Sequence, residues 1–274
     1  MSSDNVEQKI EAIETIVASI KRSKKYRDVY EGTIRELVRG EFGKHKPKAL
    51  EKAVRKRLHR IVAPYVGDPD YARATAELET AFASGDSASV RDACVHILSS
   101  HTSTRERLQI VDRFYEEIFA LTGRPNAILD IACALNPLTF PWMGLPNTLE
   151  YHAYDIHETR VDFVNTFFSL QGLATLAKVQ DVAFDFPQET ADVAFFLKEL
   201  HRFERNYEKR GLVLLDALRV RYLVVSFPTV SLHSGRSLTN HYRQFLPELI
   251  AGRGWEIEEI EFETELVFCI DKGY

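Results

Sequence analysis

The chain has 274 residues and a formal net charge of −5, and 45% of its residues are hydrophobic while 27% are charged. These fractions are typical of a globular protein with enough apolar side chains for a sizeable core, and they exclude disorder over the whole chain. The sequence contains neither a run of about 18 apolar residues that would span a bilayer nor an apolar stretch typical of a secretion signal, so we expect a cytoplasmic protein.

The three cysteines, Cys94, Cys133 and Cys269, lie far apart and form no CxxC pair. Each stands in an apolar context. A disulfide framework and a zinc site both need cysteines at closer spacing or in larger number. We therefore expect buried, reduced thiols, and no metal.

Charge is distributed unevenly along the chain. Residues 20–60 hold 15 Lys and Arg against 5 Asp and Glu, whereas the rest of the chain holds 20 against 35. A segment with a net charge of +10 in an otherwise acidic chain favours an anionic partner for that segment.

Helices are predicted through the first 120 residues. Apolar residues recur there at helical spacing, as in Ile34, Leu37 and Val38, and the breaks between the runs carry Gly, Pro, Asp and Ser. We predict an N-terminal helical subdomain over residues 1–100 and a second domain over residues 101–274.

After residue 122, short apolar runs alternate with helical stretches. The predicted strands are 127–132, 150–156, 174–181, 192–198, 222–228, 255–262 and 264–271. The first five are far enough apart for crossover helices, whereas the last two are joined by almost nothing. This pattern predicts an α/β fold of the Rossmann-like class I methyltransferase type, with a mostly parallel sheet of seven strands that ends in an antiparallel hairpin.

Three acidic residues lie at the carboxyl ends of three successive predicted strands: Asp130, Asp155 and Asp181. In an open α/β sheet ligands bind beyond the carboxyl ends of the strands, where Asp155 can accept both hydroxyls of a ribose and Asp181 can reach an adenine amino group. The trio favours S-adenosyl-L-methionine as cofactor. Helix capping and turn formation are the alternative role for each residue taken singly.

The stretch "HTSTRER", residues 101–107, precedes the first strand. Its Ser and Thr residues followed by Glu106 can form a capping box at the start of a helix. Its two arginines can instead bind a carboxylate bidentately. The residues alone leave both interpretations open.

Several stretches together resemble one family, the aminoglycoside-resistance 16S rRNA (guanine-N7) methyltransferases. They run in the family's order over nearly the whole chain and include "SKKYRDVYEGTIREL" (23–37), "HTSTRERL" (101–108), "LDIACALNP" (129–137), "YDIH" (154–157), "LKELHRFE" (197–204), "VSFPTVSL" (225–232) and "TELVF" (264–268). The resemblance implies methyl transfer from S-adenosyl-L-methionine to N7 of guanine 1405 in 16S rRNA of the assembled 30S subunit. That modification blocks certain aminoglycosides.

The resemblance also implies roles for particular residues. Arg107 would bind the methionine carboxylate, Asp155 the ribose and Asp181 the adenine. The full set expected at the cofactor is His101, Ser103, Thr104, Arg107, Asp130, Ala132, Cys133, Ala134, Asn136, Asp155, Ile156, Gln180, Asp181, Val182 and Lys198. Those expected to position the target base are Lys198, Glu204 and Ser226. No general base is expected, because guanine N7 carries a lone pair and no proton.

RNA binding is expected of the basic segment, by a protein that we expect to act as a monomer. A structured RNA is recognised mainly through shape and phosphates, which suits cationic side chains on helices. The expected contacts are Lys21, Arg22, Lys24, Lys25, Arg27, Lys52, Arg55, Lys56, Arg57 and Arg236. The alternative for such highly charged helices is a solvated face without a partner.

Two stretches depart from the family pattern. Val230 stands where the family usually has Lys and is followed by an altered loop, and Lys198 is followed by "ELHRFE" instead of the common apolar and proline residues. These positions belong to the region expected to hold the target nucleotide. An alternative function is therefore that of a divergent member with weak, altered or no methylation activity, acting as a ribosome-binding module.

Overall fold

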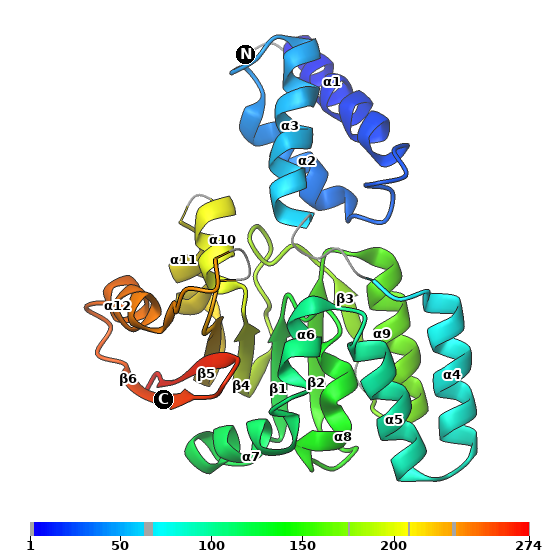
Figure 1. Ribbon diagram of the computed structural model, residues 1–274. Helices are drawn as coiled ribbons and strands as arrows, with labels where there is room; N and C mark the ends of the chain where they lie inside the picture. Colours follow the sequence, from blue (N-terminus) through cyan, green and yellow to red (C-terminus); the bar gives the residue numbers. More distant parts are fainter. Residues whose placement is uncertain (1–2, 63–67, 175, 208, 232–233, 274) are drawn as a thin grey trace.

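A computed structural model describes residues 3–62, 68–174, 176–207, 209–231 and 234–273 (Figure 1). Seven strands form one sheet in the order β3-β2-β1-β4-β5-β7-β6. The strands are β1 (Ala127–Ile131), β2 (Glu150–Asp155), β3 (Ala177–Val179), β4 (Thr190–Leu197), β5 (Arg219–Pro228), β6 (Glu256–Glu261) and β7 (Glu265–Asp271). All seven predicted strands are confirmed, and so is the predicted fold class.

Strand pairing fixes where a ligand can bind. β1 pairs in parallel with both β2 and β4, while β7 runs antiparallel to β5 and β6. From β1 the chain builds the sheet outward through β2 and β3, then returns to the other side of β1 for β4 and β5. The switch point therefore lies between β1 and β4, and the crevice at the carboxyl ends of these strands is where ligands bind in such sheets.

Helices cover both faces of the sheet, and three of them, α1 to α3, lie above the sheet in the view of Figure 1. They are α1 (Ser3–Lys21), α2 (Glu31–Glu41), α3 (Pro47–Val62), α4 (Tyr71–Ala83), α5 (Ser87–Leu98), α6 (Thr102–Arg107), α7 (Val111–Thr122), α8 (Phe140–Met143), α9 (Glu158–Gln171), α10 (Leu200–Asn206), α11 (Gly211–Ala217) and α12 (Thr239–Leu249). No helix in the described part of the chain is both long and apolar enough to cross a membrane.

The core consists of two hydrophobic clusters, one on each face of the sheet. Ile128 packs in the cluster that includes α4, α5, α7 and α9, whereas its neighbour Leu129 packs in the cluster with α10, α11 and α12. Successive side chains of a strand point to opposite faces, so central strands such as β1 and β7 carry apolar residues at most positions, whereas the edge strand β6 is largely exposed.

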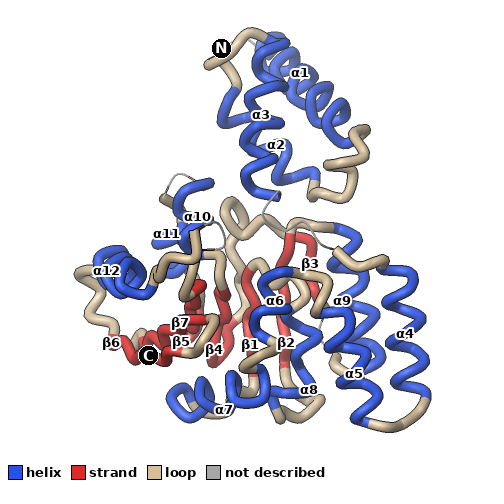
Figure 2. Tube along the Cα trace, in the orientation of Figure 1, coloured by secondary structure: helices blue, strands red, loops and turns tan. Residues whose placement is uncertain are grey.

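The seven N-terminal helices do not form one unit. Helices α1, α2 and α3 pack on one another and stand above the carboxyl ends of the strands, whereas α4 packs on α5 and on α9 beside the sheet (Figure 2). Packing thus separates α1–α3 from α4 and α5. The predicted boundary at residue 100 stays a proposal.

Candidate functional site

The turn after β1 is built from alanines instead of glycines. Ala132 and Ala134 adopt positive φ angles of 52° and 46°, a conformation that costs a non-glycine residue about 1–2 kcal/mol. Backbone hydrogen bonds hold the turn against β2, since the Cys133 amide donates to the Tyr154 carbonyl and the Ala134 amide to the Asp155 carboxylate. The small side chains leave space directly above the turn.

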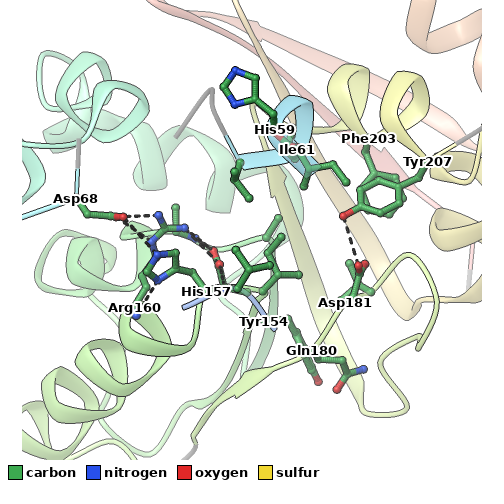
Figure 3. Close-up of a pocket in the computed structure, with 18 of the residues that line it drawn as sticks. His59, Ile61, Asp68, Tyr154, His157, Arg160, Gln180, Asp181, Phe203 and Tyr207 are labelled. Carbon is green, nitrogen blue, oxygen red and sulfur yellow. Dashed lines mark hydrogen bonds and ion pairs between the residues drawn. The ribbon is translucent and has the colours of Figure 1, made fainter. Parts of the chain in front are cut away.

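A first cavity of about 300 Å³ opens on one side of this turn, over the ends of β2 and β3 (Figure 3). Five residues that the sequence placed at the cofactor line it beside the turn: Asp155, Ile156, Gln180, Asp181 and Val182. Its other walls are largely apolar, with Phe203 and Tyr207 from the region of α10. An apolar slot with acceptors at one edge fits a nucleoside.

Asp155 is held by a network that sequence reasoning missed. Its carboxylate accepts hydrogen bonds from the backbone amides of Ala134 and His157 and from Nη1 of Arg160, at 3.0, 2.8 and 3.1 Å. Arg160 also donates to Asp68, at 2.8 Å. Arg160 lies on α9 five residues after Asp155, which is a weak local signal, whereas no local pattern points to Asp68.

Asp181 caps the turn that follows β3. Its carboxylate accepts a hydrogen bond from the Ala183 amide at 3.0 Å, and the Tyr207 hydroxyl donates to it at 3.4 Å (Figure 3). Burial raises the pKa of Asp181 to about 6. Asp181 therefore both caps the turn after β3 and lines the first cavity.

The N-terminal helices form the roof of the first cavity, which the sequence did not predict. Lys25, Val29, His59, Ile61 and Val62 line it from above. The roof is tied to the sheet domain by backbone hydrogen bonds. The Tyr30 amide donates to the Ile156 carbonyl at 2.7 Å, and the Glu158 amide donates to the Asp28 carbonyl at 2.7 Å.

A second cavity of about 400 Å³ lies on the other side of the turn, over the ends of β1, β4 and β5. It shares Ala132, Ala134 and Glu199 with the first cavity. The remaining predicted residues that line it are His101, Ser103, Thr104, Arg107, Asp130, Cys133, Asn136 and Lys198. The two cavities therefore adjoin at the switch point of the sheet.

Arg107 is neutralised by a partner that the sequence did not reveal. Its guanidinium makes a bidentate ion pair with Glu265 of β7, at 2.7 and 3.2 Å, and donates to the Asn136 side chain at 2.7 Å. Burial alone would raise the pKa of Glu265, but the charges of Arg107 and Lys198 hold it below its usual value. Binding of a carboxylate by Arg107 stays a prediction.

Asp130 lies beneath the second cavity. The Asn136 side chain and the Tyr151 hydroxyl donate hydrogen bonds to it at 2.9 and 2.8 Å. Burial raises the pKa of Asp130 to about 7, although both hydrogen bonds favour the charged form. The carboxyl group can therefore change its charge near neutral pH.

The three residues expected to position a target base occupy different places. Lys198, at a positive φ of 58°, lines the second cavity, and its Nζ lies 2.8 Å from Glu106 and 3.3 Å from Glu265. Ser226 is fully buried behind that wall, where its hydroxyl accepts a hydrogen bond from the Lys198 amide. The carboxylate of Glu204 accepts a hydrogen bond from the Leu212 amide of α11, and Glu204 is not among the residues that line either cavity, so its role at the target base stays a prediction.

The basic residues lie on the α1–α3 unit, but they differ in exposure. Arg22, Lys24, Lys25, Arg27, Lys52 and Lys56 are exposed. The partly buried ones have protein partners: Lys21 pairs with Glu158, Arg55 with Glu51 and Arg57 with Glu41. Arg236 is exposed in the loop after β5, of which residues 232–233 lie outside the described part.

Comparison with known proteins places this chain in a family. A family model described as "Ribosomal RNA methyltransferase (FmrO)" matches residues 22–269. The chain is 33% identical over 266 residues to a 16S rRNA (guanine(1405)-N(7))-methyltransferase of Micromonospora echinospora, covering 95% of this chain and 97% of the relative. It is 35% identical over 264 residues to an enzyme of that name from Serratia marcescens, covering 95% and 99%.

Solved structures agree with this assignment. The 16S rRNA methylase RmtB superposes with a TM-score of 0.78 at 33% identity, covering 95% of this chain and 98% of that chain. The 16S rRNA methyltransferase RmtF in complex with S-adenosyl-L-homocysteine superposes with a TM-score of 0.77 at 29% identity, with the same coverage. The chain belongs to the FmrO family of ribosomal RNA methyltransferases.

Proposed function

We propose that this protein transfers a methyl group from S-adenosyl-L-methionine to N7 of guanine 1405 in 16S rRNA, and so confers aminoglycoside resistance. The relatives covered over nearly their full length carry the name of this activity. The observation that carries the proposal is the meeting of the two cavities at Ala132 and Ala134. A nucleoside in the first cavity and a base in the second face each other across that turn.

The residues of the first cavity fit the adenosyl part of the cofactor. Asp155 and Asp181 present carboxylates to the cavity, and Val29, Ile61 and Val182 supply apolar contacts for a purine ring. The methionine part would extend past the alanine turn toward Asp130 and Arg107 in the second cavity. When bound, the sulfonium supplies an electrophilic methyl group.

Methyl transfer to guanine N7 requires only that N7 be held in line with the methyl group of the cofactor. N7 offers an in-plane lone pair and no proton, so the rate depends on positioning and on exclusion of water. Lys198 lines the second cavity in a strained backbone conformation that Ser226 fixes through its hydrogen bond with the Lys198 amide. We assign Lys198 to the positioning of the target and Ser226 to the support of Lys198.

The α1–α3 unit is proposed to bind the 30S subunit. Its exposed residues Arg22 and Lys24 lie in the turn after α1, and Lys52 and Lys56 lie on α3, where they can contact phosphates of folded RNA. Arg236, beyond the second cavity, would add a contact near the target base. We keep the expectation that the protein acts as a monomer.

The test is methylation of purified 30S subunits. The protein is incubated with labelled S-adenosyl-L-methionine and either intact 30S subunits or free 16S rRNA, and the modified base is mapped by primer extension after cleavage at 7-methylguanine. We expect label at guanine 1405 in 30S subunits. Binding of 30S subunits with no label in them, from a preparation that binds S-adenosylhomocysteine, would instead favour the ribosome-binding module.

A further inference from the structure

Glu199 occupies the point where the two cavities meet. It lies two residues after the end of β4 and directly before α10, and β4 is the neighbour of β1 at the switch point. Among the described residues that line the two cavities, only Ala132, Ala134 and Glu199 line both. A group at this position lies beside the place where donor and acceptor of the methyl group come together.

The side chain of Glu199 is buried without a visible structural purpose. Only 8% of the residue is exposed, and its Oε2 atom has no hydrogen-bond partner among the described residues. It does not cap α10, whose first amide bonds come from Arg202 and Phe203 to the Glu199 carbonyl. A buried polar atom without a partner costs stability, so its retention points to a ligand that completes it.

The environment keeps this carboxyl group protonated near neutral pH. Burial raises the pKa of Glu199 to about 8, and the nearby charges of Arg202 and Arg205 oppose this only in part. A protonated carboxyl group carries an O–H donor, which a carboxylate lacks. At neutral pH Glu199 therefore offers a donor to a ligand in the cavities.

The bases differ in the group that they place beside N7. Guanine presents the O6 acceptor there, whereas adenine presents an amino group that donates. We infer that Glu199 is a specificity-determining residue whose protonated carboxyl group donates a hydrogen bond to O6 of the target guanine. The inference rests on the proposed function and names the contact that selects guanine for methylation at N7.

Other titratable groups line the same two cavities, and their ionisation can also contribute to the dependence of activity on pH. Besides Glu199, those of the first cavity are Lys25, His59, Asp68, Tyr154, Asp155, His157, Arg160, Asp181 and Tyr207. Those of the second cavity include His101, Glu106, Arg107, Asp130, Lys198, His201, Arg202, Arg205 and Tyr242. Burial lowers the pKa of His201 to about 3, while Asp181 and Asp130 titrate at about 6 and 7, all below Glu199. A loss of activity near pH 8 is therefore assigned to Glu199 only where Glu199→Gln abolishes it.

The experiment measures single-turnover formation of 7-methylguanine in 30S subunits between about pH 6 and 9. It compares the natural protein with Glu199→Gln, which keeps a donor but cannot ionise, and with Glu199→Leu, which has no donor. Glu248→Gln, an exposed glutamate on α12, is the matched control. Calorimetric titration with S-adenosylhomocysteine checks that each variant is folded and binds cofactor.

We expect the rate of the natural protein and of the control to fall as the pH passes about 8, where Glu199 ionises. Glu199→Gln retains the rate at neutral pH and loses this fall. Glu199→Leu is slower at neutral pH by about 10- to 100-fold, the usual effect of one buried hydrogen bond to a substrate, with unchanged cofactor affinity.

Three results would overturn the inference and leave the proposed function intact. They are a Leu variant with the natural rate and profile, an inactive Gln variant, which would show that an anion is required, and a Leu variant that loses cofactor affinity. Failure of the natural protein to methylate guanine N7 in 30S subunits, although it binds cofactor, would overturn the proposed function and this inference together.

Discussion

Arg107 and Glu265 form a bidentate ion pair that is buried under the second cavity and joins α6 to β7 across 158 positions of the chain. Lys198 adds a second positive charge at 3.3 Å from the same carboxylate. The pair fixes the last strand of the sheet to the segment that enters the cofactor site. Buried pairs of this kind are sensitive to loss of one partner, because the remaining charge is left uncompensated.

Glu265→Gln should therefore destabilise the protein strongly. Removal of the carboxylate leaves Arg107 buried with a neutral partner, and we expect a loss of about 3–5 kcal/mol in the free energy of unfolding, measured with urea. Glu263→Gln is the matched control, since Glu263 pairs with Arg113 at the surface and should lose less than about 1 kcal/mol. Equal losses in the two variants would show that burial of the pair has no special role.

The alanine turn makes a prediction about cofactor binding. Ala134→Gly accepts the positive φ without strain and adds no atoms, so affinity for S-adenosylhomocysteine should be retained within a few-fold. Ala134→Val places a β-branched side chain at a φ of 46° between the two cavities, and binding should be lost. Calorimetry measures both variants, and full binding by the Val variant would remove the turn from the cofactor site.

The buried Asp130 predicts an unusual dependence of stability on pH. Its pKa of about 7 in the folded protein exceeds the value near 4 expected of an unfolded chain, so the folded state binds this proton more tightly. The resulting stabilisation is complete below about pH 4 and is lost as the pH rises through about 7.

Asp130→Asn tests this dependence, because an amide oxygen can still accept hydrogen bonds from Asn136 and Tyr151. The free energy of unfolding, measured between about pH 5 and 8, should fall less steeply with pH in the variant than in the natural protein. Parallel curves would mean that Asp130 is already ionised throughout this range.

The sequence predicted the sheet and the residues next to it in the chain more fully than the long-range contacts. Short apolar runs between helical stretches predict the strands, and an acid at the carboxyl end of a parallel strand lies at the edge of the sheet where ligands bind. Arg160 and Asp68 are 92 positions apart, and Arg107 and Glu265 are 158 apart. No local pattern encodes such pairs, so the network behind the site appeared only in the folded structure.

The helical segment shows the same limit. Helical periodicity predicts each helix but does not say which neighbours it packs against. Val29 and Ile61 belong to the segment expected to bind RNA, and both line the first cavity. Likewise, Glu204 lies in a stretch whose resemblance to the family implied a role in positioning the target base. Its carboxylate accepts a hydrogen bond from the Leu212 amide at the start of α11.

The roof of the cofactor cavity changes which lysines are suited to a test of RNA binding. Lys25 lines the first cavity and lies 2.8 Å from His59, so its substitution would disturb cofactor and RNA binding together. Lys52 and Lys56 are exposed on α3 and do not line that cavity. They separate the two activities more cleanly.

We expect the double variant Lys52→Ala with Lys56→Ala to bind 30S subunits more weakly at every salt concentration. Loss of two phosphate contacts should also reduce the slope of log affinity against log salt by roughly 1–2, because fewer counterions are released. Affinity for S-adenosylhomocysteine should stay unchanged. Filter binding over a salt series, with calorimetry alongside, measures both quantities.

The matched control is Arg221→Ala, which removes an exposed cation near the start of β5, at the opposite end of the strand from the site. If net charge alone governed association, Arg221→Ala would lower the affinity for 30S subunits and the salt slope. The decrease for each charge removed would then equal that of the α3 variant. A normal slope for Arg221→Ala together with a reduced one for the α3 variant would locate the phosphate contacts on α3. A natural slope in the α3 variant would contradict the assignment of these lysines to RNA.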